Sequence, residues 1–269
     1  MNAREALLIV KEVVERSGDS KVVHSYYLEF GRRLEVLKLV DEYCKQGLAV
    51  LDLGAQPFII SCALKKMGFN VTAFDIDPEP YKEIADACGV GVIRCDLERD
   101  ELNVNNVDCA VFSEVLEHLH YYYAPLVLSK INKALKLGGV LILTTPNIAS
   151  LFRRLRLLLG IQPQYRFHVH EYTMKEIVAL LREAGFEIIK AYYSIVDDLT
   201  YIDADPDDYL RISSFEDLVR IALKRPTKLN ILRLLAYPIV KIKPSLRQLI
   251  VVVATKAREP MVQVMERWG

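Results

Sequence analysis

The side chains best suited to chemistry in this sequence stand where short apolar runs end. Successive runs end in, or are followed at once by, Asp52, Asp75, Asp96 and Ser113. Ligands of open α/β sheets bind beyond the carboxyl ends of the strands, so these side chains are expected to face one site. An acidic residue about twenty positions beyond the first glycine turn, here Asp75 after Gly54, is where a ribose diol is held.

The turn after the first run lacks the glycines of a dinucleotide site. The segment AVLDLGAQPFII, residues 49–60, contains Gly54 but then reads Ala-Gln-Pro where G-x-G-x-x-G would continue. Those glycines let the backbone approach a pyrophosphate. A nicotinamide-dependent dehydrogenase is therefore a remote alternative.

Two pairs of histidines offer further reactive side chains. His118 and His120 follow the fourth run, and His168 and His170 precede a predicted helix. A histidine can serve as a general base, which a reaction needs only when the attacking group of the substrate must lose a proton. We take His118 and His170 as candidate catalytic residues, against the alternative that each caps a helix or binds backbone in the core. Nothing in the sequence brings the pairs together, so no metal site is expected.

Apolar runs alternate with helical patterns through the middle of the chain, which predicts a parallel sheet covered by helices on both faces. The predicted strands are Ala49–Leu53, Val71–Phe74, Val90–Arg94, Asp108–Phe112 and Val140–Thr144. The predicted helices are Ala3–Glu15, Tyr26–Lys45, Phe58–Met67, Glu79–Cys88, Tyr122–Leu137 and Thr173–Ala184. In KLGGV, residues 136–140, glycine is expected to end a helix.

Two more strands are predicted, in residues 186–196 and 246–256. About fifty residues separate them, which is long enough for a functional insertion. The expected division is into N-terminal helices (1–46), a ligand-binding core (47–196), a helical insertion or lid (197–245), and a terminal strand with a tail (246–269).

Five motifs occur in a familiar order: VLDLGAQP, VTAFDIDPE, CDL, FSEVLEHL and LKLGGVLILTTPN. Together they resemble the class I S-adenosylmethionine-dependent methyltransferases, and they are most similar to the small-molecule branch that includes the ubiquinone-biosynthesis O-methyltransferases. The resemblance covers roughly Val50 to Lys190. It implies an α/β fold with a doubly wound, seven-stranded, mostly parallel sheet, and S-adenosyl-L-methionine as the cofactor.

The cofactor-binding residues implied by this resemblance are Asp52, Gly54, Asp75, Asp96, Leu97 and Ser113. Asp52 and Gly54 would face the methionine part, and Asp75 would accept hydrogen bonds from both ribose hydroxyls. Asp96 would meet the adenine amino group, and Ser113 would lie near the methionyl amino group.

Gln56 and Phe58 depart from the later glycines of the family. S-adenosylmethionine carries no phosphate, so one close backbone approach at Gly54 can suffice. The shape of the turn stays open.

Composition limits the partners. Lys plus Arg and Asp plus Glu both number 35, and neither an Asn/Asp-Pro-Pro-Tyr motif after the fourth run nor a Pro-Cys dipeptide occurs. A small-molecule acceptor is therefore favoured and nucleic acid is not expected. The five cysteines never form a C-x-x-C pair, which predicts reduced, buried thiols in a cytoplasmic protein. No apolar run is long enough to span a membrane.

Two basic, apolar segments stand out. No acidic residue occurs from Arg220 to Arg258, and SLFRRLRLLLG, residues 150–160, also lacks one. Together they predict an apolar, positively rimmed entrance for an amphiphilic or anionic acceptor, with peripheral contact to an anionic membrane. The alternative is that both segments close the core with their charges solvated.

The function expected from these residues is methyl transfer from S-adenosylmethionine to a small organic or lipid-like acceptor. A catalytically silent fold that binds the cofactor or a partner is the alternative, because the turn at Gln56 is altered and no base is obvious. The acceptor and the oligomeric state cannot be predicted from the sequence.

Overall fold

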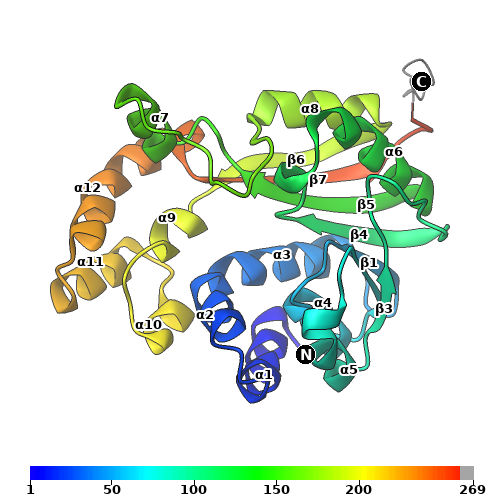
Figure 1. Ribbon diagram of the computed structural model, residues 1–269, viewed down its shortest axis with the longest axis horizontal. Coiled ribbons are helices and arrows are strands. Elements are labelled where there is room, and N and C mark those ends of the chain that lie inside the picture. The colour runs from blue at the N-terminus through cyan, green and yellow to red at the C-terminus, as the bar shows by residue number, and fades with distance from the viewer. Residues whose placement is uncertain (261–269) are drawn as a thin grey trace.

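A seven-stranded sheet forms the centre of the molecule (Figure 1). The structure is a computed structural model that describes residues 1–260. The strands are β1 Ala49–Leu53, β2 Asn70–Asp75, β3 Gly91–Arg94, β4 Val107–Ser113, β5 Leu135–Pro146, β6 Phe186–Ser194 and β7 Leu249–Lys256. Their order is β3-β2-β1-β4-β5-β7-β6, and only β7 runs antiparallel to its neighbours. The predicted doubly wound, mostly parallel fold is confirmed. The order reverses between β1 and β4, which is where such sheets bind ligands.

Helices cover both faces of the sheet (Figure 1). One face carries α1 Ala3–Arg16, α2 Ser20–Leu28, α3 Phe30–Tyr43, α4 Ile59–Lys66 and α5 Lys82–Cys88, and the other carries α6 Ala124–Ala134 and α8 Met174–Glu183. Successive side chains of a strand point to opposite faces. In β7, Val251 and Val253 join the core under the first group of helices, whereas Ile250 and Val252 join the core under the second. This double burial explains the continuous apolar run of that strand.

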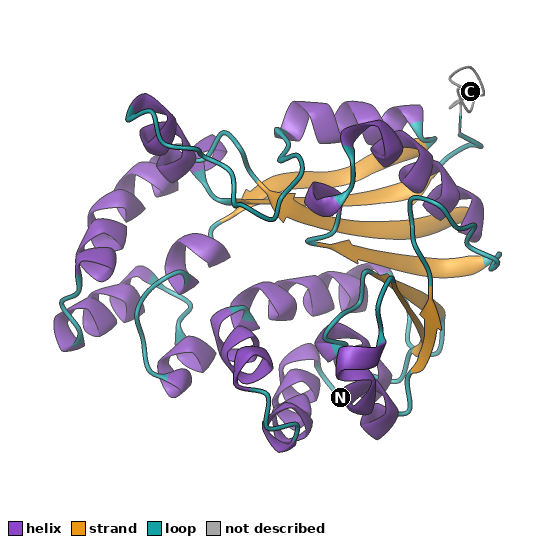
Figure 2. Cartoon of the chain, viewed as in Figure 1, coloured by secondary structure: helices purple, strands orange, loops and turns teal. Residues whose placement is uncertain are grey.

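Further helices extend beyond the carboxyl ends of the parallel strands (Figure 2). These are α7 Leu151–Leu158 after β5, and α9 Val196–Thr200, α10 Pro206–Arg211, α11 Phe215–Lys224 and α12 Lys228–Ile242 between β6 and β7. Short 3₁₀ helices lie at Glu79–Tyr81, Leu116–His118, Tyr121–Tyr123 and Pro244–Leu246. Residues 261–269 of the predicted tail lie outside the described residues.

Two predicted helix boundaries are wrong. The helix expected at Tyr26–Lys45 is divided at Glu29, whose φ of −100° and ψ of 9° separate α2 from α3. The segment KLGGV belongs to β5 instead of ending a helix, because Leu135 already pairs with Val107 of β4. A side chain at Gly139 would lie 2.8 Å from the Lys136 carbonyl oxygen, so this glycine permits close backbone packing.

The expectation that all cysteines are reduced is also wrong. Disulfides join Cys44 to Cys109 and Cys62 to Cys88, and Cys95 is a buried free thiol. No helix in the described part of the chain is long and apolar enough to cross a lipid bilayer.

Candidate active site

Two small adjoining cavities lie at the carboxyl edge of β1, β2 and β4. The turn cavity, of about 100 Å³, is lined by Asp52, Gly54 and Ser113 among others. The β2–β3 cavity, of about 360 Å³, is lined by Gly54, Asp75, Asp96 and Leu97 among others. All six predicted cofactor residues therefore line one of these two cavities, and Gly54 lines both.

The carboxylate of Asp75 is held in a fixed orientation at the end of β2. Its Oδ2 accepts a hydrogen bond from the Gln56 backbone N–H at 2.9 Å, and its Oδ1 accepts one from Asp77 N–H at 3.1 Å. The Gln56 side chain donates to the Asp77 carbonyl at 2.5 Å. A carboxylate oxygen has a second lone pair, so both oxygens remain able to accept from a diol. Gln56 thus braces the turn in place of a family glycine.

Gly54 packs too closely against Val115 to carry a side chain, and its close approach to the cofactor stays a prediction. Its φ is 68°, and a Cβ atom there would lie 2.4 Å from Val115 Cγ2. Asp52 lies beneath the turn, where Ser61 Oγ donates to its Oδ2 at 2.5 Å. Burial raises the pKa of Asp52 to about 6. Ser113 Oγ shares a hydrogen bond of 2.8 Å with Thr144 Oγ1.

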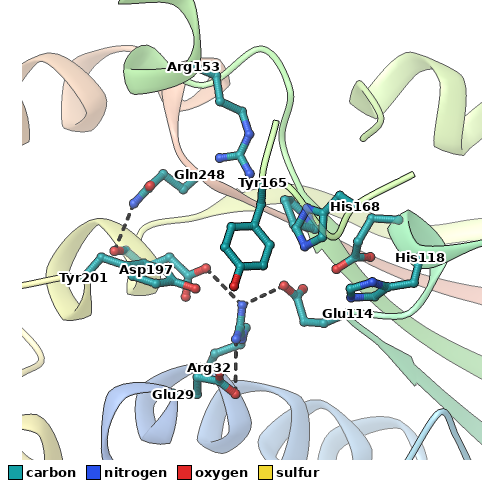
Figure 3. A pocket seen from close by; sticks show the side chains of 12 residues that line it. Glu29, Arg32, Glu114, His118, Arg153, Tyr165, His168, Asp197, Tyr201 and Gln248 are labelled. Atoms are coloured by element: carbon teal, nitrogen blue, oxygen red, sulfur yellow. Dashed lines mark hydrogen bonds and ion pairs between the residues drawn. The ribbon is translucent and has the colours of Figure 1, made fainter. Parts of the chain in front are cut away.

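A larger space, the insertion cavity, of about 480 Å³, opens beside them (Figure 3). Its polar side chains come from α3, the segment 114–118 after β4, α7 and the loop after it, α9 and the residue that follows it, and the residue before β7. They include Arg32, Glu114, Glu117, His118, Arg153, Tyr165, His168, Asp197, Tyr201 and Gln248. Glu29, Arg32 and Glu114 also line the turn cavity, and His118 also lines the β2–β3 cavity. The three spaces therefore lie next to one another and share lining residues. Apart from Pro146, the side chains that line this cavity are charged or polar, and the apolar, positively rimmed entrance expected from the sequence stays a prediction.

Arg32 joins three parts of the chain at the floor of the insertion cavity (Figure 3). Its Nη1 lies 2.6 Å from Glu114 Oε2 and 3.4 Å from Asp197 Oδ2, and its Nη2 lies 3.3 Å from Glu29. Loss of hydration raises the pKa of Glu114 to about 8, although the charge of Arg32 opposes this. Glu114 has a φ of 58°, a strained conformation that clusters at functional sites. Arg32 has no sequence motif, and the sequence analysis missed it.

His118 and His168 lie close together, which the spacing of the two histidine pairs did not predict. Their ring centroids are 4.9 Å apart, and one ligand atom from each of Glu117, His118 and His168 lies within 4.8 Å of the others. Burial raises the pKa of Glu117 to about 7, and Thr145 Oγ1 donates to its carboxylate at 2.9 Å.

Glu171 orients two side chains that line the insertion cavity, those of His168 and Arg153. It accepts from His168 Nδ1 at 2.7 Å and from Arg153 Nη2 at 2.8 Å. Burial acts to raise the pKa of Glu171, but the hydrogen bonds from His168 and Arg153 lower it to about 2. A histidine that binds a metal through one ring nitrogen commonly donates the N–H of the other to a carboxylate, as His168 does to Glu171. Glu117, His118 and His168 thus fit a divalent cation.

The structure does not bring His170 to the insertion cavity. Its ring packs between Tyr121 and Tyr172, with centroids 4.9 Å and 4.5 Å away. Its Nε2 is buried and has no hydrogen-bond partner among the described residues. His168, two positions earlier, faces the cavity instead (Figure 3).

Comparisons with known proteins place this geometry in a family. A family model described as "Methyltransferase domain" matches residues 25–191, which is more than half of the chain. A curated relative, the ribosomal protein L11 methyltransferase of Campylobacter hominis, is 51% identical over 41 residues. That match spans only 15% of this chain and 14% of the relative.

Solved structures share the fold at low sequence identity. A S-adenosylmethionine-dependent methyltransferase from Archaeoglobus fulgidus has a TM-score of 0.58 at 19% identity, over 88% of this chain and all of its own. Magnesium protoporphyrin IX methyltransferase from Synechocystis PCC 6803, solved with bound S-adenosylhomocysteine, has a TM-score of 0.55 at 16% identity, over 86% of this chain and 85% of its own. The family match shows that the chain belongs to the methyltransferase-domain family, and the solved structures show that it shares the fold of S-adenosylmethionine-dependent methyltransferases.

Proposed function

We propose that the protein transfers the methyl group of S-adenosylmethionine to a hydroxyl or amino group on the polar part of a small organic or lipid-like acceptor bound in the insertion cavity. The observation that carries this proposal is the shared lining. Glu114 lines both the insertion cavity and the turn cavity, and His118 lines both the insertion cavity and the β2–β3 cavity. A methyl group leaving the cofactor near these residues would face the insertion cavity.

Methyl transfer from a sulfonium is an in-line displacement, so positioning of the acceptor atom supplies much of the rate. Tyr165 projects into the middle of the cavity toward Arg32, where both offer hydrogen bonds to a polar acceptor (Figure 3). Partial burial, reinforced by His168, lowers the pKa of His118. His118 is therefore neutral at pH 7 and able to take a proton from the acceptor.

With a divalent cation held by Glu117, His118 and His168, His118 would be a ligand and no longer the base, and the cation would instead lower the pKa of an acceptor hydroxyl bound to it. The protein residues would still orient the acceptor, and Glu171 would hold His168 in place through Nδ1.

The test is formation of S-adenosylhomocysteine with panels of phenols, alcohols, amines and carboxylic acids, each with and without an alkyl tail. We expect turnover with at least one polar class and a loss of at least tenfold in His118→Gln. His24→Gln, which changes an exposed histidine on α2, is the matched control. Turnover confined to wholly apolar acceptors or to RNA, or an unaffected His118→Gln enzyme, would contradict the proposal.

A further inference from the structure

The outer side of α7 exposes a cluster of large apolar side chains. On α7 and the residues that follow it, these are Leu155, Leu157, Leu158, Leu159 and Ile161. Leu158 alone is 82% exposed. An α-helix on a protein surface normally turns polar side chains outward. Exposed apolar side chains that cluster in this way mark an interaction site.

The outer side of α12 has the same character. Its inner face buries Arg233, Tyr237 and Val240. The outer face exposes Leu229, Ile231, Leu232, Leu235, Ile239 and Ile242. Ile242, at the end of the helix, is 84% exposed.

The two helices form one surface. The Arg233 guanidinium of α12 lies over the Phe152 ring of α7 at 4.1 Å from its centroid. Shortly before α7, Asn147 Nδ2 donates at 3.1 Å to the carbonyl of Ser245, shortly after α12, so the C-terminal end of α12 lies near the start of α7 (Figure 1). We call the exposed side chains of residues 154–161 and 228–243 the α7–α12 surface.

The charge on this surface has a single sign. Its basic residues are Arg154, Arg156, Lys228, Lys241 and Lys243, and neither segment contains an acidic residue. Nearby basic residues that do form ion pairs are turned elsewhere: Arg153 pairs with Glu171 inside the insertion cavity, and Lys224 pairs with Asp205 at 2.6 Å.

We propose that the α7–α12 surface binds peripherally to an anionic lipid bilayer. Leucine and isoleucine side chains would enter the boundary between headgroups and acyl chains, and the lysines and arginines would contact the anionic headgroups. A second copy of the chain fits less well, because pairing this surface with itself would bring two sets of positive charges together.

The bilayer would then lie against the segment that builds the insertion cavity. Arg153 of α7 and Tyr165 of the following loop both line that cavity. Membrane binding is nevertheless separate from methyl transfer, so vesicle binding and turnover can fail independently.

The experiment is co-sedimentation of the full chain with vesicles of phosphatidylcholine alone or with one third phosphatidylglycerol, at low and high salt. The apolar variant is Leu158→Ser with Ile242→Ser, and its control is Leu137→Ser, which changes a leucine 72% exposed in β5. The charge variant is Lys241→Gln with Lys243→Gln, and its control is Lys65→Gln with Lys66→Gln on α4. Circular dichroism and S-adenosylhomocysteine binding confirm that each variant is folded.

We expect binding to anionic vesicles that weakens at high salt. The charge variant should bind about 30-fold more weakly, from roughly 1 kcal/mol for each basic residue near an anionic surface. The apolar variant should lose at least tenfold, while both controls bind like the wild type. The proposal would be overturned if the protein did not bind vesicles, or if these substitutions left vesicle binding unchanged. It would also be overturned if the protein self-associated with rising concentration and the apolar variant abolished this.

Discussion

Gly54 lines both the turn cavity and the β2–β3 cavity, and its substitution by alanine should lower the free energy of unfolding in two separable ways. The first is backbone strain at a φ of 68°, about 1–2 kcal/mol for a residue with a Cβ atom. The second is a clash with Val115, whose Cγ2 and Cγ1 would lie 2.4 and 2.9 Å from the new atom. Overpacking of this kind costs about 1–3 kcal/mol.

Gly89 supplies the matched control, because it has a φ of 67° and no atom within 4 Å of its virtual Cβ position. Gly89→Ala should therefore lower the free energy of unfolding by the strain alone, whereas Gly54→Ala should lower it by about 2–5 kcal/mol. Displaced Val115 would also narrow the β2–β3 cavity that it lines. We expect at least tenfold weaker S-adenosylhomocysteine binding in Gly54→Ala and none of this loss in Gly89→Ala.

A second substitution tests the clash itself. In a Val115→Ala background, only the Cβ atom of residue 115 remains, at 3.3 Å, so the extra cost of Gly54→Ala should fall to that of Gly89→Ala. Urea unfolding and calorimetric titration measure both quantities. Equal costs for the two glycines in the wild-type background, or no rescue by Val115→Ala, would refute the reasoning.

Three further outcomes are expected. Asp75→Asn should weaken S-adenosylhomocysteine binding by about 10- to 100-fold, because a hydrogen bond to a charged group contributes about 1.5–3 kcal/mol; calorimetry that gives an unchanged affinity for the folded variant would reject the ribose assignment. Burial raises the pKa of Asp52 from 3.8 to about 6 on folding, so the unfolded chain releases its proton at lower pH and the free energy of unfolding should fall by about 2 kcal/mol as pH rises from 4 to 7. Asp52→Asn should remove that contribution, which urea titrations at both pH values measure. Replacing Cys44 and Cys109 with alanine should destabilise the fold by roughly 4 kcal/mol through the added freedom of the unfolded chain; identical unfolding curves for oxidised wild type and variant would argue against the bond.

The strands, and the side chains that line the turn cavity and the β2–β3 cavity at their ends, could be predicted because their signals are local. A buried strand is a short apolar run, and Asp52, Asp75 and Asp96 stand at fixed positions relative to such runs. Parallel pairing then brings their carboxyl ends to one edge, whatever the intervening helices do.

The insertion cavity could not be predicted in the same way. Arg32, Arg153 and Tyr165 come from three separated segments and follow no periodicity that distinguishes them from surface residues. Their convergence depends on how α3, α7 and the loop after α7 pack at the edge of the sheet, which is a tertiary property. The same holds for the pairing of Cys44 with Cys109, 65 positions apart in the sequence.

The two disulfides also change the covalent topology of the chain. Cys62 and Cys88 both fall between Cys44 and Cys109, so one closed ring lies inside another, and β1, β2 and β3 are within the larger ring. A protease that cuts once between residues 45 and 108 leaves two fragments that remain joined until a reductant is added. Force applied at the ends of the molecule cannot extend this part either, and about 220 Å of chain, at roughly 3.4 Å per residue, stays hidden from the pulling coordinate. The half of the sheet that carries Asp52 and Asp75 therefore behaves as one covalently closed unit.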